Sequence, residues 1–310
     1  MDAHEKIENS IMKLIFKVLR ISGLPVLVRE LIQRNKVTIL LFHDISKETA
    51  EQTFSYLSRK YNIIDLNDFI EAHERKIGSK LPKKALIITF DDGNIRNYEI
   101  LPSIRKYNIP VTIFLCTSII NTNRQYWFKS ETLSVSVSKF YLQSNEWYAD
   151  LLKYGFEKDK EFDKPQALQN THIEDMKHYV NFQSHTMYHP ILPKCNEREA
   201  QKEIFGSKEI LENTYGLKIN AISYPNGDYS ERDILLSKEA GYKCGITVDF
   251  GYNTIETDIF KLKRLSVNDT DDINELIVRA SGVWPKISLT PLLCASALKT
   301  LKKSCSPLLK

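Results

Sequence analysis

Two pairs of residues in the sequence could carry out hydrolytic chemistry together. Asp91 and Asp92 are adjacent carboxylates, and His185 and His189 are imidazoles four positions apart. Because side chains alternate in direction at the end of a strand, one carboxylate can bind a metal ion while its neighbour faces a bound water. One helical turn would place both imidazoles on one face, toward the same metal. Two histidines and one carboxylate leave coordination positions open, as metal-assisted hydrolysis requires.

The elements that must position these residues read as parallel strands separated by helices. Continuous apolar, β-rich runs at 37–42 and 85–90 are typical of buried parallel strands, and the second run ends at Asp91. Further strands are predicted at 111–116, 180–183, 221–224, 243–248 and 263–267. This pattern predicts a parallel α/β sheet or barrel, whose active site is built where the strands end. We therefore expect Asp91, His185 and the Tyr224-Pro225 pair to lie close together.

Three segments differ in composition from the rest of the chain. Residues 11–36 and 286–310 mix Leu, Ile and Val with Lys and Arg and contain almost no acid, which predicts basic amphipathic segments at 1–36 and 286–310. These are either terminal helices packed on the domain or attachments to an anionic membrane surface. Residues 117–178 are too long for an ordinary connection, so we expect an insertion with its own helices. The barrel would then cover residues 37–285.

The overall composition narrows the class of protein. The chain has 310 residues, is 42% hydrophobic and 26% charged, and suits one barrel-sized domain or two small ones. Its net charge of +4 is mild, and no basic block alternates with aromatic residues, so nucleic acid is not an expected partner. The five cysteines form no CxxC pair, which argues against a thiolate zinc site. Lys13, Lys17 and Arg20 interrupt the first apolar stretch, so we expect no secretory signal or membrane-spanning helix, and a cytoplasmic location.

Three short motifs give the sequence a resemblance to a known family. Residues 89–93 (TFDDG) resemble the first motif of the NodB-type polysaccharide deacetylases, carbohydrate esterase family four. Residues 185–189 (HTMYH) resemble their second motif, H-[ST]-x-x-H, and residues 224–227 (YPNG) are similar to the third. The resemblance implies a distorted (β/α)7-type barrel with parallel strands. It also implies a metal-dependent hydrolase that removes an N-acetyl group from an amino sugar, in a glycan or in a lipid-linked glycan intermediate.

The same resemblance implies a role for each candidate residue. Asp91 would be the general base. A divalent ion, usually zinc in this family, would be held by Asp92, His185 and His189. The third motif would contact the substrate and the oxyanion, and it includes Tyr224, Pro225 and Asn226. The backbone N–H of Asn226 would stabilise the oxyanion together with the metal.

Two further residues are predicted where the sequence departs from the family pattern. The third motif often begins with an arginine that orients the base, but Ser223 or Tyr224 stands there, and Arg264 at the end of another strand is the best substitute. The late histidine that usually protonates the leaving amine is absent, because no histidine follows His189. His43 follows the first strand, which can neighbour the last strand in a closed barrel, and we expect it to be the general acid. An early histidine resembles the circularly permuted branch of the superfamily, the poly-N-acetylglucosamine deacetylases.

Two other functions fit parts of this pattern. A deacetylase fold that has lost catalysis and only binds sugar would be favoured by loss of Asp91 or of a metal ligand, and all of these residues are present. A non-haem iron oxygenase also uses two histidines and one carboxylate, but its close H-x-[DE] pair is missing and its fold is antiparallel. The N-deacetylase is therefore the preferred interpretation, and the inactive carbohydrate-binding protein is the alternative.

Overall fold

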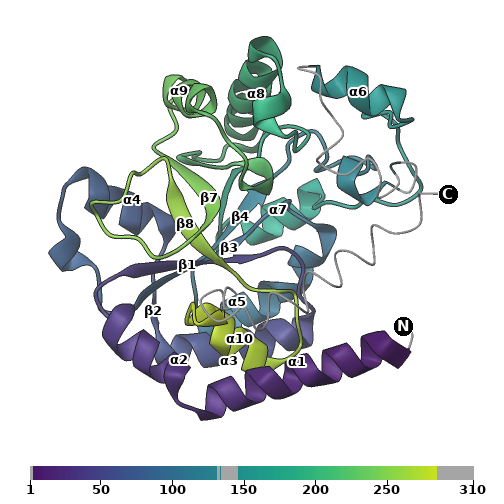
Figure 1. Ribbon diagram of the computed structural model, residues 1–310. Coiled ribbons are helices and arrows are strands. Elements are labelled where there is room, and N and C mark those ends of the chain that lie inside the picture. Colours follow the sequence, from purple (N-terminus) through teal and green to yellow (C-terminus); the bar gives the residue numbers. More distant parts are fainter. Residues whose placement is uncertain (1–2, 131–132, 134–145, 285–310) are drawn as a thin grey trace.

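The chain forms a closed barrel of seven parallel strands surrounded by helices (Figure 1). This computed structural model describes residues 3–130, 133 and 146–284. The strands are β1 (Val37–Phe42), β2 (Asn62–Ile63), β3 (Ala85–Phe90), β4 (Val111–Leu115), β5 (Val180–Ser184), β6 (Ala221–Ser223), β7 (Cys244–Phe250) and β8 (Leu262–Ser266). Their order around the barrel is β1-β8-β7-β6-β5-β4-β3, and β3 pairs with β1 to close it, while β2 joins the start of β3. The (β/α)7-type barrel predicted from the sequence is confirmed.

Most of the helices cover the outside of this barrel. The α-helices are α1 (Ala3–Ile21), α2 (Leu24–Leu27), α3 (Lys47–Lys60), α4 (Leu66–Glu74), α5 (Leu101–Tyr107), α6 (Trp147–Lys153), α7 (Asn170–Met176), α8 (Glu197–Tyr215), α9 (Glu231–Glu239) and α10 (Ile273–Ala280). Short π or 3-10 turns are η1 (Val28–Ile32), η2 (Gly78–Lys80), η3 (Ile95–Ile100), η4 (Trp127–Lys129), η6 (Leu192–Lys194) and η7 (Pro225–Gly227). None of the helices in the described part of the chain is long and apolar enough to cross a membrane.

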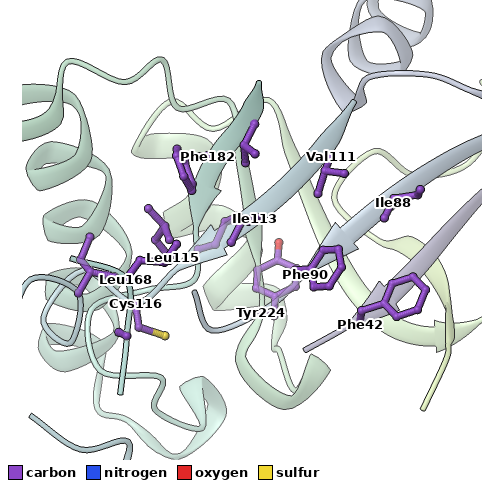
Figure 2. Close-up of a cluster of buried hydrophobic side chains, with 14 of the residues drawn as sticks. Phe42, Ile88, Phe90, Val111, Ile113, Leu115, Cys116, Leu168, Phe182 and Tyr224 are labelled. Atoms are coloured by element: carbon purple, nitrogen blue, oxygen red, sulfur yellow. The ribbon is translucent and has the colours of Figure 1, made fainter. Parts of the chain in front are cut away.

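Side chains along each strand alternate between the lumen of the barrel and the layer of helices. In β3, Ile88 and Phe90 belong to the large core that includes side chains of α3, α5 and α8 (Figure 2). Ile87 belongs to a second core, where side chains from strands around the barrel meet the apolar face of α4. Thr89 and Asp91 lie two and four residues after Ile87, so the strand directs both toward the lumen. The period of the strand therefore decides which of the two adjacent carboxylates faces inward.

The structure describes only part of the three segments predicted outside the barrel, at 1–36, 117–178 and 286–310. The N-terminal segment forms α1, α2 and η1, and α1 packs along α10 (Figure 1). In the predicted insertion, residues 117–178, the described residues form η4, α6 and α7. The C-terminal segment predicted at 286–310 lies outside the described residues. The boundaries of all three segments stay predictions.

Candidate active site

A buried ion pair between Asp91 and Arg264 occupies the end of the lumen. Arg264 has no exposed surface, and its two terminal nitrogens donate to Asp91 Oδ1 at 2.8 Å and to Asp91 Oδ2 at 2.7 Å. Its Nε donates to the carbonyl of Thr247 at 2.8 Å. Ser223 Oγ donates to Asp91 Oδ2 at 3.1 Å. The structure thus brings Arg264 to Asp91, in the fork geometry that holds a carboxylate in one orientation.

This ion pair keeps the Asp91 carboxylate charged. Burial acts to raise its pKa, but the positive charge of Arg264 and then that of His185 outweigh burial, and the pKa of Asp91 lies well below its usual range. The hydrogen bonds from Arg264 act in the same direction. Asp91 is therefore an ionised carboxylate beneath the site.

Asp92, His185 and His189 form a second, separate cluster beside Asp91. The Nε2 atoms of His185 and His189 each lie 3.5 Å from Asp92 Oδ1. One ligand atom from each of the three residues can be chosen so that all lie within 4.8 Å of one another. The two imidazole rings meet nearly edge to face, with centroids 4.7 Å apart. The three side chains thus converge on one point from two loops.

The donor atoms of this cluster fit a divalent metal ion. Asp92 Oδ1 and His189 Nδ1 are buried without a hydrogen-bond partner among the described residues. In the described part of the chain, Asp92 has no partner like the Arg264 guanidinium that pairs with Asp91, and burial raises the pKa of its carboxyl. Burial and then the charge of His185 lower the pKa of His189 well below its usual value, which favours the neutral imidazole that metals bind. An unpaired carboxylate oxygen that faces the Nε2 atoms of two histidines provides the ligand set of an open metal site.

The orientation of His185 is set by the barrel itself. Its Nδ1 lies 2.8 Å from the carbonyl oxygen of Ser223 on β6. A carbonyl only accepts, so Nδ1 carries a proton, and Nε2 is the ring nitrogen turned toward Asp92. A metal-binding imidazole commonly has its second nitrogen held in this way.

The segment that carries the two histidines, residues 185–189, is a loop. The expectation that one helical turn aligns the histidines is wrong, because Thr186 has φ 65° and His189 has φ 59°, both in the left-handed region. Thr186 Oγ1 accepts a hydrogen bond from the backbone N–H of His189 at 3.2 Å. The rings meet because the loop folds back on itself.

Glu203 of α8 holds this loop in place. Its Oε2 accepts the backbone N–H groups of Met187 at 2.8 Å and Tyr188 at 2.9 Å, and its Oε1 accepts the Tyr148 hydroxyl of α6. The side chain is 1% exposed. Burial raises the pKa of Glu203 to about 8, against the lowering effect of the two N–H donors. An acceptor on one helix therefore replaces the hydrogen bonds that a helical turn would have made within the loop.

Three aromatic residues of the insertion support the cluster, although no sequence motif predicted them. The Tyr126 hydroxyl donates to the backbone carbonyl of Asp92 at 2.9 Å. Trp127 Nε1 donates to the carbonyl of His189 at 2.7 Å. The Phe128 ring lies 4.7 Å from the His189 ring and is 38% exposed. Three consecutive aromatic residues in an otherwise polar stretch were the only local signal.

The predicted residues not yet described are His43 and those of the third motif. His43 is exposed and follows β1 at the same end of the barrel as Asp91. Its backbone N–H donates to Asp269 Oδ1 at 3.1 Å.

The residues of the third motif differ in where their side chains lie. Asn226, in η7, has φ 57° and a buried Nδ2 without a hydrogen-bond partner among the described residues.

The side chain of Tyr224 is not brought to the cluster. It belongs to the large core outside the barrel (Figure 2). The Tyr224 ring packs directly against Gly245 of β7. A Cβ atom added to Gly245 would lie only 2.3 Å from the Tyr224 hydroxyl oxygen. Ser223 points into the lumen, and strand alternation therefore sends Tyr224 outward. Pro225 is buried and begins η7.

The chain belongs to the polysaccharide deacetylase family, whose sequence profile matches residues 78–245, more than half of the chain. Poly-beta-1,6-N-acetyl-D-glucosamine N-deacetylase of Staphylococcus aureus (strain MRSA252) is 24% identical over 246 residues, which are 79% of this chain and 74% of that protein. YxkH of Bacillus subtilis (strain 168), provisionally assigned as a polysaccharide deacetylase, is 23% identical over 190 residues. That match spans 61% of this chain and only 53% of the length of YxkH.

Solved structures share the fold. IcaB from Ammonifex degensii superposes with a TM-score of 0.58 at 17% identity, covering 79% of this chain and 97% of that one. The deacetylase PplD of Streptococcus pyogenes, solved with acetate, gives a TM-score of 0.57 at 19% identity, covering 78% and 98%. The resemblance read from the three motifs is confirmed at the level of the family.

Replacing Glu203 by alanine should lower the free energy of unfolding by ~2–6 kcal/mol, because two loop N–H groups lose their acceptor at ~1–3 kcal/mol each. The matched control is Glu209→Ala on the exposed face of the same helix, which should change stability little. Chemical denaturation of both variants measures the difference. Equal stabilities of the two variants would remove Glu203 from this role.

Proposed function

We propose that this chain is a metal-dependent N-deacetylase that removes the acetyl group from an amino sugar, in a glycan or in a lipid-linked glycan intermediate. The observation that carries the proposal is the division between the two neighbouring carboxylates. The Asp91 carboxylate is hydrogen-bonded by Arg264. The Asp92 carboxylate faces two imidazoles, and its Oδ1 has no hydrogen-bond partner among the described residues. A hydrolase that uses one carboxylate as a base and the other as a ligand needs this difference.

Asp92, His185 and His189 would hold the ion, and zinc is the metal we expect. When bound, a zinc ion polarises the amide carbonyl and lowers the pKa of its water toward ~7. The support comes from the three convergent donors and from the hydrogen bond that turns His185 Nε2 toward Asp92. The deacetylase family to which the chain belongs is consistent with such an ion.

The protein's own groups would carry the protons. Asp91 takes a proton from the attacking water, and Arg264 fixes the orientation of its carboxylate as a positioning residue. The backbone N–H of Asn226 is the proposed donor to the oxyanion, and the neighbouring Pro225 helps to hold that turn. His43 is the proposed general acid that gives a proton to the departing amine.

The substrate class is proposed from the relatives. The Staphylococcus aureus relative acts, by its name, on poly-β-1,6-N-acetyl-D-glucosamine. The exposed Phe128 ring beside His189 offers an apolar surface to a sugar or to an acetyl methyl group. We therefore propose N-acetylglucosamine glycans as the first substrates to test. The cytoplasmic location expected from the sequence stays a prediction.

Metal-loaded protein should release acetate from β-1,6-linked N-acetylglucosamine oligomers, and chelation should abolish the release until zinc or cobalt is added back. Acetate is measured enzymatically, and bound metal by elemental analysis. Full activity in metal-free protein would contradict the metal dependence. Binding of the oligomers without any acetate release would favour the inactive carbohydrate-binding protein.

Substitution of the two carboxylates should give different defects. Asp91→Asn should keep the metal and lose most of kcat, whereas Asp92→Ala should lose the metal itself. Asp228→Asn, an exposed position in the loop after η7, is the matched control and should change neither. Equal metal content in the Asp91 and Asp92 variants would refute the division of roles.

His43→Ala should reduce kcat by ~10²–10⁴ while metal content and melting temperature stay nearly unchanged, because a positioned acid contributes about that much. His178→Ala, another exposed histidine, serves as the control. A His43 variant with near-normal kcat would leave the proton donor to another group.

A further inference from the structure

The N-terminal helices expose an unusual amount of apolar surface. Six large side chains between residues 11 and 31 are each more than half exposed: Ile11 (52%), Leu14 (60%), Val18 (58%), Ile21 (73%), Leu27 (56%) and Leu31 (73%). We name these six residues the apolar stripe. Elsewhere in the described residues, only Leu152 and Leu235 among large apolar side chains are exposed to that degree. In α1 the spacing of the stripe, three or four residues apart, places its members on one face of the helix.

The opposite face of α1 is already packed, so the stripe is not the underside of an unfinished core. Phe16 is 2% exposed and meets Trp284 with ring centroids 4.7 Å apart. The guanidinium of Arg279 on α10 lies over the same Phe16 ring at 5.5 Å. Val278 completes this cluster. Since α1 is fixed to the barrel by one face, its second apolar face points away from the protein.

The charge around the stripe selects an anionic partner. Residues 11–36 contain six basic residues and one acid, Glu30. Lys13, Lys17, Arg20 and Arg34 are exposed, whereas Arg29 is buried. Lys13 and Lys17 line a shallow hollow together with Asp271 and Asp272, which precede α10. Glu30 is already paired with Arg29 and Lys84. Residues 285–310 of the sequence are also basic, with five lysines and no acid. An apolar helix face beside lysines and an arginine has the composition of helices that lie in a membrane interface.

We propose that the apolar stripe and its basic neighbours dock this protein on an anionic lipid surface. The stripe would enter the interface between headgroups and acyl chains, while Lys13 and Lys17, on its flank, contact the phosphates. Arg20 is not included, because it donates to Asn274 Oδ1 of α10 at 3.0 Å. The docked helix also borders the carboxyl end of the barrel. A hollow of about 970 Å³ is lined by Lys13 of α1 together with Asp44 and Asp269. Asp44 follows His43 in the sequence, and Asp269 accepts a hydrogen bond from the backbone N–H of His43.

This inference rests on the surface of the fold and not on the proposed function, so the test involves no enzyme activity. The intact protein is sedimented with vesicles of phosphatidylcholine alone and with vesicles of an equimolar mixture of phosphatidylcholine and phosphatidylglycerol. We expect binding to the anionic vesicles that falls as salt is added, because exposed charges are screened. Equal sedimentation with both kinds of vesicle would overturn the proposal.

Two pairs of variants locate the contact. Lys13→Gln/Lys17→Gln should weaken vesicle binding about 30-fold, the equivalent of ~1 kcal/mol for each charge. Leu14→Gln/Val18→Gln should weaken it by at least roughly tenfold, because two apolar side chains no longer enter the interface. The controls are Lys80→Gln/Lys218→Gln and Leu152→Gln/Leu235→Gln, which alter exposed residues of the same kinds outside the segment.

Unchanged melting temperatures establish that the variants remain folded. Weakening by the control pairs as large as that by the stripe pairs would overturn the location. Sedimentation equilibrium without lipid tests the other occupant, a second copy of the chain. Self-association that Leu14→Gln/Val18→Gln abolishes, without vesicle binding by the unmodified protein, would assign the stripe to a dimer contact and overturn the lipid proposal.

Discussion

The bidentate pair between Arg264 and Asp91 is the interaction on which the site depends. It joins β8 to the end of β3 across the lumen, and Ser223 of β6 bonds to both partners. Two ions buried together are expensive to remove from water, and the cost is offset only when geometry and further hydrogen bonds are good. Here the guanidinium also donates to Thr247. Loss of one partner would leave an uncompensated charge, at a cost of ~3–5 kcal/mol.

The same pair separates the chemistry of two adjacent carboxylates. Asp91 continues the inward side of β3 and meets a fixed cation, whereas Asp92, at φ 72°, turns out of the strand toward His185 and His189. Their environments therefore move the two pKa values in opposite directions, down for Asp91 and up for Asp92. Pairs of acids whose pKa values are driven apart are typical of acid-base sites. The positive φ of Asp92, directly after β3, is what sends the two carboxylates into these different environments.

Most strands of the barrel could be predicted because each one corresponds to a local pattern in the sequence. Buried parallel strands are continuous apolar runs, and the bounds of β1 and β3 coincide with the runs at 37–42 and 85–90. Arg264 could be proposed as the best substitute for the missing arginine because it lies on a predicted strand, although the structure places it within β8 and not at its end. Strand alternation would also have predicted the outward position of Tyr224, since the lumen-facing Ser223 precedes it.

Other features depend on contacts between distant residues and leave no local trace. The loop at 185–189 is shaped by Glu203, which lies on the following helix, and a spacing of four residues cannot reveal that acceptor. Tyr126 and Trp127 reach backbone carbonyls of the cluster from within a polar insertion. The apolar stripe was visible only as composition, because a helical pattern does not say which face is packed. Long-range hydrogen bonds and exposure therefore had to come from the structure.

The position of the metal relative to the two carboxylates tests the central claim most directly. Crystals of the protein grown with zinc and measured at the zinc absorption edge would give an anomalous difference peak that locates the ion without reference to activity. We expect one strong peak bonded to Asp92, His185 and His189, with Asp91 still paired to Arg264. A peak bonded to Asp91, with the Arg264 pair broken, or the absence of a peak at these residues in crystals that contain zinc, would contradict the assignment.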